Sequence, residues 1–139
     1  MPIDEGSGAR EPGTGAIGDT VERLNSILWT ERDLLDELLF AIETERWVRS
    51  TGRRRFDLLA RERLRATGHL LRRTEVLRAA ESDAVAARLG LAAARSLVEL
   101  ADGAGDPWRT ILLDQRAALR AATHEVVQAG LSATTPSGG

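Results

Sequence analysis

Residues 21–45 read VERLNSILWTERDLLDELLFAIETE, and this stretch decides the fold of the chain. Its apolar residues recur at intervals of three and four, which keeps one side of a helix apolar over about five turns. They are Leu24, Ile27, Leu28, Leu34, Leu35, Leu38, Leu39 and Ile42. We place the acidic residues on the opposite side: Glu31, Asp33, Asp36, Glu37, Glu43 and Glu45. The pattern predicts a long amphipathic helix that packs against a partner from its own chain or from another.

The composition of the whole chain also favours helices. Aromatic residues make up 4% of the 139 residues, so leucine and alanine must fill most of the core. Leu, Ala, Arg and Glu are good helix formers, whereas strand-forming residues are few and tyrosine is absent. No run alternates between apolar and polar residues over the length of a strand. We therefore predict an all-α protein whose length suits a single domain with a real core.

The two ends of the chain differ in composition from the middle. Residues 1–18 contain five glycines and two prolines, which predicts a disordered lead-in, and residues 132–139 form a flexible tail. The helical bundle domain then covers residues 19–131. The first residues do not form a signal peptide, and no stretch approaches the roughly 18 apolar residues that a membrane span needs. We expect a cytoplasmic protein without membrane insertion.

Capping signals set the expected bounds of the first two helices. Asp19 is a good N-cap, and Glu22 three residues later completes a capping box. The first helix is expected to run to about Glu43, with a connection over residues 44–51 around Trp47. The second helix is expected to run from the Phe56 region to about residue 80, and only Gly52 forces a break between the two.

Shorter segments are expected before the last helix. Ser82 is the predicted N-cap of a segment that ends at residues 89–90, and another short helix is expected over residues 93–100. Asp106 followed by Pro107 starts the last helix, because a capping side chain precedes a proline at the first helical position. Gly130 is the expected C-cap. Together these elements predict a coiled-coil-like antiparallel bundle of three long helices, with short helices between the second and the third.

Charge is divided unevenly between the first two helices. Residues 19–45 hold eight acidic residues and two arginines, a net charge of −6, and residues 46–78 hold eleven arginines and three acidic residues, a net charge of +8. In a hairpin these charges would lie side by side, each exposed pair contributing about 0–1 kcal/mol. Alternatively, Arg53, Arg54 and Arg55 form a docking patch for an acidic partner or for nucleic acid. No aromatic residues interleave with the arginines to stack bases, so we expect no nucleic-acid partner.

The residues that usually carry catalysis are scarce. The two histidines, His69 and His124, follow Ala66 and Ala121 at three residues' distance, so the Glu-x-x-His motif of di-iron bundles is absent. The chain has no cysteine, no His-Glu-x-x-His, no Gly-x-Ser-x-Gly and no P-loop. We expect no catalytic, cofactor-binding or metal site.

One enzyme class stays open as an alternative, a small helical bundle like the chorismate mutases. Such a pocket gathers arginines and a lysine or glutamine around a dicarboxylate. Here the first helix offers only Arg23 and Arg32, and the chain contains no lysine.

A succession of local signatures extends over residues 21–131. The first helix ends in ELLFAIETERW, RRRFDLLARERLRATGHLL follows, then come Arg88-Leu89-Gly90-Leu91 and SLVEL, and the last helix contains LLDQRAALRAATHEVVQAGL. This order resembles the FlgN-type flagellar export chaperones. The resemblance implies a small helical cytoplasmic protein that binds hook-associated proteins before their export through the flagellar type III secretion apparatus. Components of that apparatus are further expected partners.

The last helix carries the candidate binding residues. The family commonly shows an asparagine there, two leucines at +3 and +4 and an apolar residue at +8, where this chain has Thr123, Val126, Val127 and Leu131. The apolar spacing is kept and the asparagine is replaced. The helix also has more apolar surface than one seam requires, which is typical of a binding surface. The candidate partner-binding residues are Leu119, Ala122, Thr123, Val126, Val127 and Leu131. The other reading is that the first two helices cover this surface.

A second function class is a structural or secreted helical-hairpin protein that acts as a dimer. Small secreted hairpins carry Trp-x-Gly in their turn, whereas Trp47-Val48-Arg49 has no glycine at the third position. The sequence leaves the oligomeric state and the identity of the cargo open.

Overall fold

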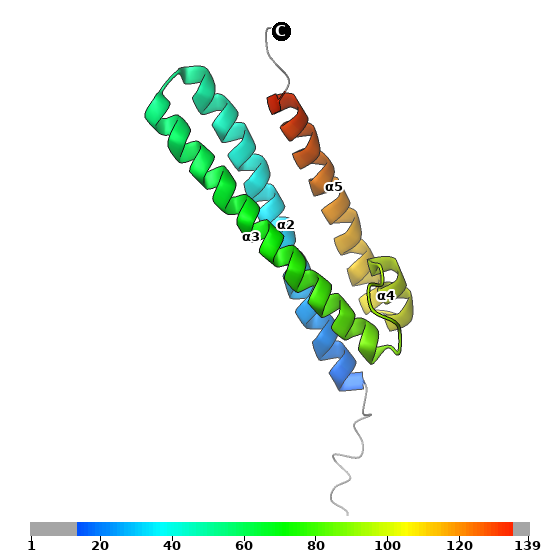
Figure 1. Cartoon of the computed structure of the whole chain (residues 1–139). Helices are drawn as coiled ribbons and strands as arrows, with labels where there is room; N and C mark the ends of the chain where they lie inside the picture. Colours follow the sequence, from blue (N-terminus) through cyan, green and yellow to red (C-terminus); the bar gives the residue numbers. More distant parts are fainter. Residues whose placement is uncertain (1–13, 135–139) are drawn as a thin grey trace, which may run out of the picture. The chain divides into compact units, whose positions relative to one another are not determined.

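The computed structural model describes residues 14–134, and the regular elements in that range are helices (Figure 1). They are α2 (Thr14–Thr51), α3 (Arg54–Arg88), α4 (Leu97–Ala104) and α5 (Trp108–Thr134). Three of them have 38, 35 and 27 residues, and α4 has eight. The described range holds no strand, which confirms the predicted all-α class.

Helix α2 is longer at both ends than the capping signals predicted. It is already helical at Thr14, so Asp19 lies inside the helix, and residues 14–18 are not part of a disordered lead-in. At the other end α2 continues to Thr51, so Trp47 lies on the helix rather than in the connection. The physical reason for the extension to Thr51 is the absence of any glycine or proline between Gly18 and Gly52. The rest of the predicted lead-in, residues 1–13, lies outside the described range.

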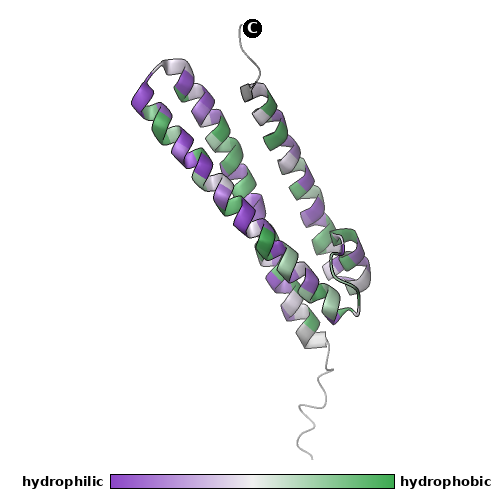
Figure 2. Cartoon of the chain, viewed as in Figure 1, coloured by the Kyte–Doolittle hydropathy of each residue, from purple (hydrophilic) through white to green (hydrophobic). Residues whose placement is uncertain are grey.

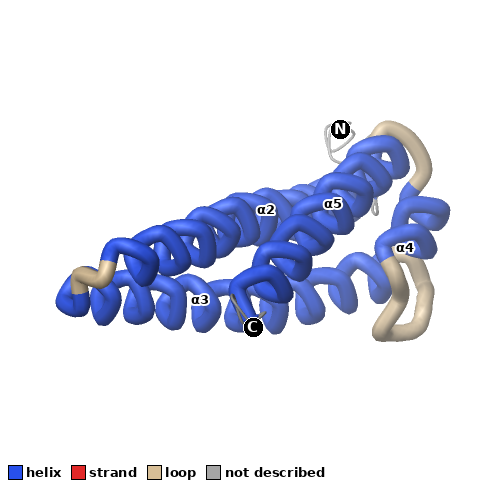
Figure 3. Tube along the Cα trace, turned by 90° about the horizontal axis from the view of Figure 1, so that it is seen from above, coloured by secondary structure: helices blue, strands red, loops and turns tan. Residues whose placement is uncertain are grey.

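Gly52 and Arg53 alone join α2 to α3, and the chain reverses there (Figure 3). Gly52 has a φ of 74°, in the left-handed region that glycine enters at little cost. Its N–H donates to the carbonyl oxygen of Arg49 at 3.2 Å, and the Thr51 hydroxyl donates to the carbonyl oxygen of Val48 at 2.6 Å. The prediction that Gly52 breaks the helix is therefore confirmed.

Helix α3 is continuous through Ser82, so the predicted N-cap at that serine is wrong. The residues around it are mostly Ala, Glu and Arg, good helix formers, and the next glycine is Gly90. The helix ends at Arg88, and Gly90 adopts a φ of 74° in the turn that follows. The Leu91 N–H then donates to the carbonyl oxygen of Ala86 at 2.8 Å and satisfies one of the last carbonyls of the helix.

Helix α4 starts four residues later than predicted, because its cap lies at Ser96. The Glu99 N–H donates to the Ser96 hydroxyl oxygen at 3.2 Å, and the Ser96 N–H donates to Glu99 Oε1 at 3.0 Å. The bond from the Ser96 backbone, together with the side chain of Arg95, holds the pKa of Glu99 below its usual range. A capping box therefore does occur in this chain, at Ser96 and not at Asp19.

Helix α5 begins at Trp108, so Pro107 lies in the turn before the helix and not at its first position as predicted, and the helix runs past Gly130 to Thr134. Gly130 is not a C-cap, because the residues after it continue the helix and the next proline comes only at position 136. A glycine inside a helix costs about 1 kcal/mol relative to alanine, which the rest of the helix tolerates. Residues 132–134, assigned to the flexible tail, are helical, and residues 135–139 lie outside the described range.

The described chain forms two compact units. The first unit combines the start of α2 up to Ile27 with Leu77–Arg116, and the second combines Leu28–Val76 with the part of α5 from Ala117 onward. In the first unit, fully buried apolar side chains come from all four helices: Val21, Leu24, Val85, Leu100 and Leu112. Gln115 Nε2 donates to Asn25 Oδ1 at 2.8 Å, which joins α5 to α2 within this core.

The core of the second unit comes from α2, α3 and α5. Its buried apolar residues are Leu28, Leu34, Leu35, Ala41, Val48, Ala60, Leu119 and Ala129. Two carboxylates lie among them, since Glu31 is 5% and Glu45 4% exposed. The prediction that both belong to the outer face is wrong. They continue the three-and-four spacing of Leu28, Leu35 and Leu38, so the helical period places them on the buried side.

Glu45 shows how the second unit accepts a buried charge. Arg49 Nη2 lies 2.6 Å from Glu45 Oε1, and Arg61 Nε lies 3.9 Å from Glu45 Oε2. The hydrogen bond and the charge of Glu45 raise the pKa of Arg49. Arg61 also pairs with Asp57, at 3.0 Å. One ion pair, Arg61–Glu45, therefore joins acidic α2 to arginine-rich α3 within this unit, in the direction that the charge division of the sequence predicted.

Candidate functional site

One face of α5 packs into the second unit. Leu119 and Ala129 are 6% and 8% exposed, and Ala122 and Val126 between them are half-buried. The spacings of three, four and three place these four residues on one side of the helix. Two of the predicted partner-binding residues, Ala122 and Val126, therefore line the seam within the unit, and Leu119 belongs to its core.

The other three predicted residues form a line on the exposed side of α5. Thr123, Val127 and Leu131 follow one another at intervals of four, and all three are exposed. Val127 is 49% and Leu131 58% exposed, a large fraction for branched aliphatic side chains. Hydrophobic residues thus continue along α5 to its C-terminal turns (Figure 2). We call Thr123, Val127 and Leu131 the α5 strip.

An arginine from α2 fixes α5 at the level of this strip. Arg46 Nη2 donates to the carbonyl oxygen of Ala129 at 3.3 Å, and Arg46 Nη1 lies 3.6 Å from Glu43 Oε1. Ala129 is on the packed side of α5, so the bond holds that side toward α2. The strip is thereby presented on a positioned helix, with the exposed polar residues His124 and Gln128 beside it.

The arginine cluster at the α2–α3 turn has an aromatic neighbour that the sequence reading overlooked. Arg53, Arg54 and Arg55 are all exposed. The guanidinium carbons of Arg53 and Arg55 lie 5.9 Å and 4.9 Å from the centre of the Phe56 ring. Two of the three cations, one from the turn and one from α3, therefore lie over the Phe56 ring.

Both histidines, His69 and His124, are exposed on the surface. His69 Nδ1 is 3.0 Å from Arg72 Nη2 on the same exposed side of α3, and His124 is exposed on α5. Among residues 14–134, no group of three or more His, Cys, Asp or Glu side chains is arranged to hold a metal ion.

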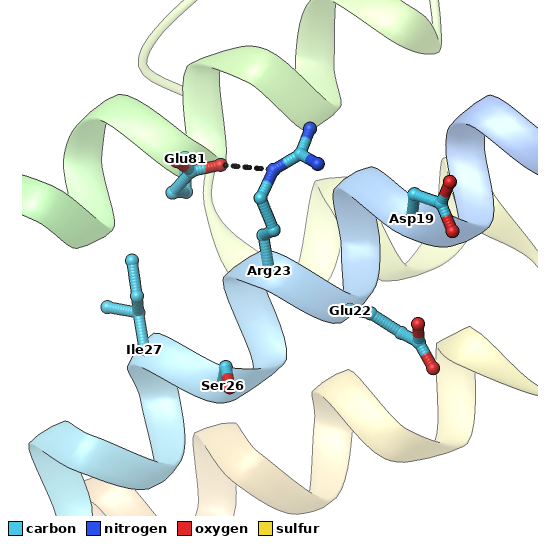
Figure 4. A pocket seen from close by; sticks show the side chains of 6 residues that line it. All are labelled: Asp19, Glu22, Arg23, Ser26, Ile27 and Glu81. Carbon is cyan, nitrogen blue, oxygen red and sulfur yellow. Dashed lines mark ion pairs between the residues drawn. The ribbon is translucent and has the colours of Figure 1, made fainter.

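A hollow in the first unit is lined mainly by polar side chains (Figure 4). Its lining comes mostly from α2: Asp19, Glu22, Arg23, Ser26, Ile27 and, from α3, Glu81. Arg23 points at Glu81, with Arg23 Nε 3.6 Å from Glu81 Oε1. The hollow holds a single arginine, already paired, whereas a chorismate-mutase-like pocket requires several that converge on a dicarboxylate.

The sequence reading missed one exposed feature of α2. Trp29, Phe40 and Trp47 are 49%, 64% and 68% exposed, so three of the five aromatic residues of the chain lie on the surface of one helix. Their intervals of eleven and seven residues put them on the same face. The intervals of eleven and seven residues are visible in the sequence, so they could have indicated that the three aromatic residues share one face of the helix.

No helix in the part of the chain that the structure describes combines the length and the apolar character that crossing a membrane requires. Comparison with protein families, with curated proteins and with solved structures finds no match to this chain.

Proposed function

We propose that this chain is an export chaperone of the FlgN type, which binds hook-associated proteins in the cytoplasm through α5. The observation that carries the proposal is the α5 strip, where Val127 and Leu131 are exposed on a helix whose opposite side is packed and tied to α2. A positioned helix with an apolar line can bind the amphipathic helix of another protein.

The architecture proposed for this role is an antiparallel, coiled-coil-like bundle of α2, α3 and α5, with α4 as the short connecting helix. The two-residue turn at Gly52 and Arg53 supports it, because so short a connection returns α3 along α2. The buried residues that α2, α3 and α5 contribute to the second unit support it as well.

The mechanism is sequestration. Terminal helices of a subunit that polymerises outside the cell carry apolar stripes that would associate if left free. The α5 strip offers substitute packing to such a helix and keeps the cargo unassembled. A strip with two large apolar side chains gives a small interface, which suits a cargo that must be released at the export apparatus. Nucleic acid, membrane insertion, metals and catalysis have no part in this proposal.

Val127→Asp tests the strip directly. The substitution places a charge in the proposed cargo contact and leaves the half-buried Val126 unchanged, so we expect binding of a purified hook-associated protein to weaken at least about tenfold. Far-UV circular dichroism and the melting temperature should stay near the wild-type values. Isothermal titration calorimetry measures the affinity.

Val76→Asp on α3 is the matched control, because Val76 is 70% exposed and also helical. It should leave cargo binding unchanged. Equal affinities of the wild type and the Val127→Asp variant would refute the role of the strip. A stable dimer that buries α5 between two chains would instead support the hairpin alternative.

A further inference from the structure

Helix α2 has an outer face on which aromatic and acidic residues alternate. Its members lie at intervals of four, three, four, three and four, so they form one line along the helix. All six are exposed: Trp29, Asp33, Asp36, Phe40, Glu43 and Trp47. We call this line the α2 stripe. An exposed row of three large aromatic side chains marks an interaction surface.

Helix α3 has an outer face with the same spacing and a different chemistry. Its exposed members are Leu58, Glu62, Arg65, His69, Arg72 and Val76, which we call the α3 stripe. Leu58 and Val76 at its ends are 65% and 70% exposed. Arginine and histidine take three of the four middle positions and Glu62 takes the other, where the α2 stripe has carboxylates and Phe40. The two faces are thus complementary in charge and equal in length.

Neither stripe is used inside the second unit. With 3.6 residues per turn, Trp29 lies about half a turn from the buried Glu31, and Leu58 lies about half a turn from the buried Ala60. Below their shared turn, α2 and α3 run side by side (Figures 1 and 3) and are linked by the Arg61–Glu45 pair. Each stripe is therefore on the side of its helix away from the packed core.

The α2 stripe has the capacity to take up cations. Within residues 14–134 neither Asp33 nor Asp36 forms an ion pair. The guanidinium carbon of Arg32 lies 3.9 Å from the centre of the Trp29 ring, so a ring of this stripe already accepts an arginine. The partner that fits is a helix with arginines between apolar residues.

We propose that this partner is a second copy of the chain, whose α3 stripe packs on the α2 stripe. An antiparallel alignment of the two lines puts Trp29 opposite Val76 and Trp47 opposite Leu58. In the same alignment Asp33 faces Arg72, and Phe40 faces Arg65 for a cation–π contact. Asp36 faces His69, and Glu43 opposite Glu62 is the one like-charged pair. Antiparallel packing also aligns the helix dipoles favourably.

Association of this kind is heterologous, because one face binds a different face of the next copy. Since each stripe lies on the side of its helix away from the shared core, we infer that a single neighbour cannot occupy both stripes of one chain. The copies therefore join head to tail in a series rather than closing as a dimer. Each contact spans 19 residues, about 27 Å of helix, which makes it small and dependent on concentration. The α5 strip has no part in it, so this inference does not depend on the proposed chaperone function.

Sedimentation equilibrium of the full-length chain over micromolar to submillimolar concentrations tests the proposal. The average mass of the wild type should rise above that of one 15.1 kDa chain and pass that of two chains without a plateau. The double variant Asp33→Arg/Asp36→Arg should weaken association at least about tenfold, since it puts one arginine opposite Arg72 and another opposite His69. The double variant Arg65→Glu/Arg72→Glu should do the same.

Charge exchange makes the test specific. A mixture of the two double variants should associate again, because the basic α2 stripe of one meets the acidic α3 stripe of the other. The chain with all four substitutions should also associate again. Asp114→Arg/Glu125→Arg and Arg88→Glu/Arg120→Glu are the controls, since they change the net charge equally at exposed residues outside both stripes and should associate like the wild type.

Three results would overturn the proposal. One is an average mass of the wild type that equals the mass of a single chain at every concentration. The partner of the α2 stripe would then be a basic helix of another protein. Another is a mass that stops at two chains. The third is a mixture of the double variants that stays monomeric although each variant keeps its far-UV circular dichroism spectrum. Val127→Asp should associate like the wild type and Val76→Asp should not, which separates this surface from the cargo site.

Discussion

Ser96 and Glu99 fix the start of α4 by bonding to each other's backbone. Ser82, which has the same side chain, lies half-buried inside α3 and does not start a helix. Glu45 shows the same dependence on position, because the helical period places it in the core and two arginines then compensate its charge. At the scale of the residue, the role of a side chain follows from its place in the helix rather than from its type.

A pair of serine substitutions tests this. Ser96→Ala removes the acceptor for the Glu99 N–H, so the free energy of unfolding should fall by about 1 kcal/mol. Ser82→Ala replaces a helix-interior serine by a better helix former and should change it by less than about 0.5 kcal/mol. Urea unfolding followed by far-UV circular dichroism measures both. Equal losses would show that the capping box does not hold α4.

At the scale of the element, glycines decide where the helices stop, and their conformation matters more than their presence. Gly52 and Gly90 have φ values of 74° and end α2 and α3, whereas Gly130 lies within α5, which continues beyond it. The space around Gly52 and Gly130 is open in both cases, so backbone conformation alone distinguishes them.

Alanine at these two positions should therefore have opposite effects. Gly52→Ala forces a residue with a Cβ into the left-handed region and should destabilise the chain by about 1 kcal/mol. Gly130→Ala removes the flexibility of a helix-interior glycine and should stabilise α5 by about 1 kcal/mol or less. Thermal melts of the two variants beside the wild type provide the comparison. Destabilisation by both would contradict the helical assignment of Gly130.

The sequence predicted the helical type of every element and came close to the starts of α3 and α5, whereas α2 and α4 start elsewhere and all four helices end later than predicted. The three-and-four spacing of leucines is a long-range signal and identified α2 correctly. The cap at Ser82 failed because a capping residue acts only where the helix is already interrupted, and strong helix formers on both sides of Ser82 prevent an interruption. Ser96 succeeds since Gly90 has already ended α3.

At the scale of the whole molecule, the candidate binding residues could be placed on one helix from the sequence but not divided between its two sides. From the spacing of Leu119, Val126 and Val127 alone, one cannot predict which of these side chains packs into the core. That division depends on where α2 presents Arg46 to Ala129, a contact between residues 83 positions apart. The α2 stripe was overlooked for a related reason: exposure belongs to the folded unit, and sequence periodicity alone gives only the face.

The aromatic content of α2 gives the molecule an optical reporter. Of the three tryptophans, Trp29 and Trp47 belong to the α2 stripe, and Trp108 is half-buried in the first unit. No tyrosine contributes to the emission. Fluorescence of the unlabelled chain therefore comes chiefly from two solvent-facing indoles. The wavelength of maximum emission should decrease when copies of the chain associate and should increase again on dilution. Binding of cargo to α5 should leave this wavelength unchanged.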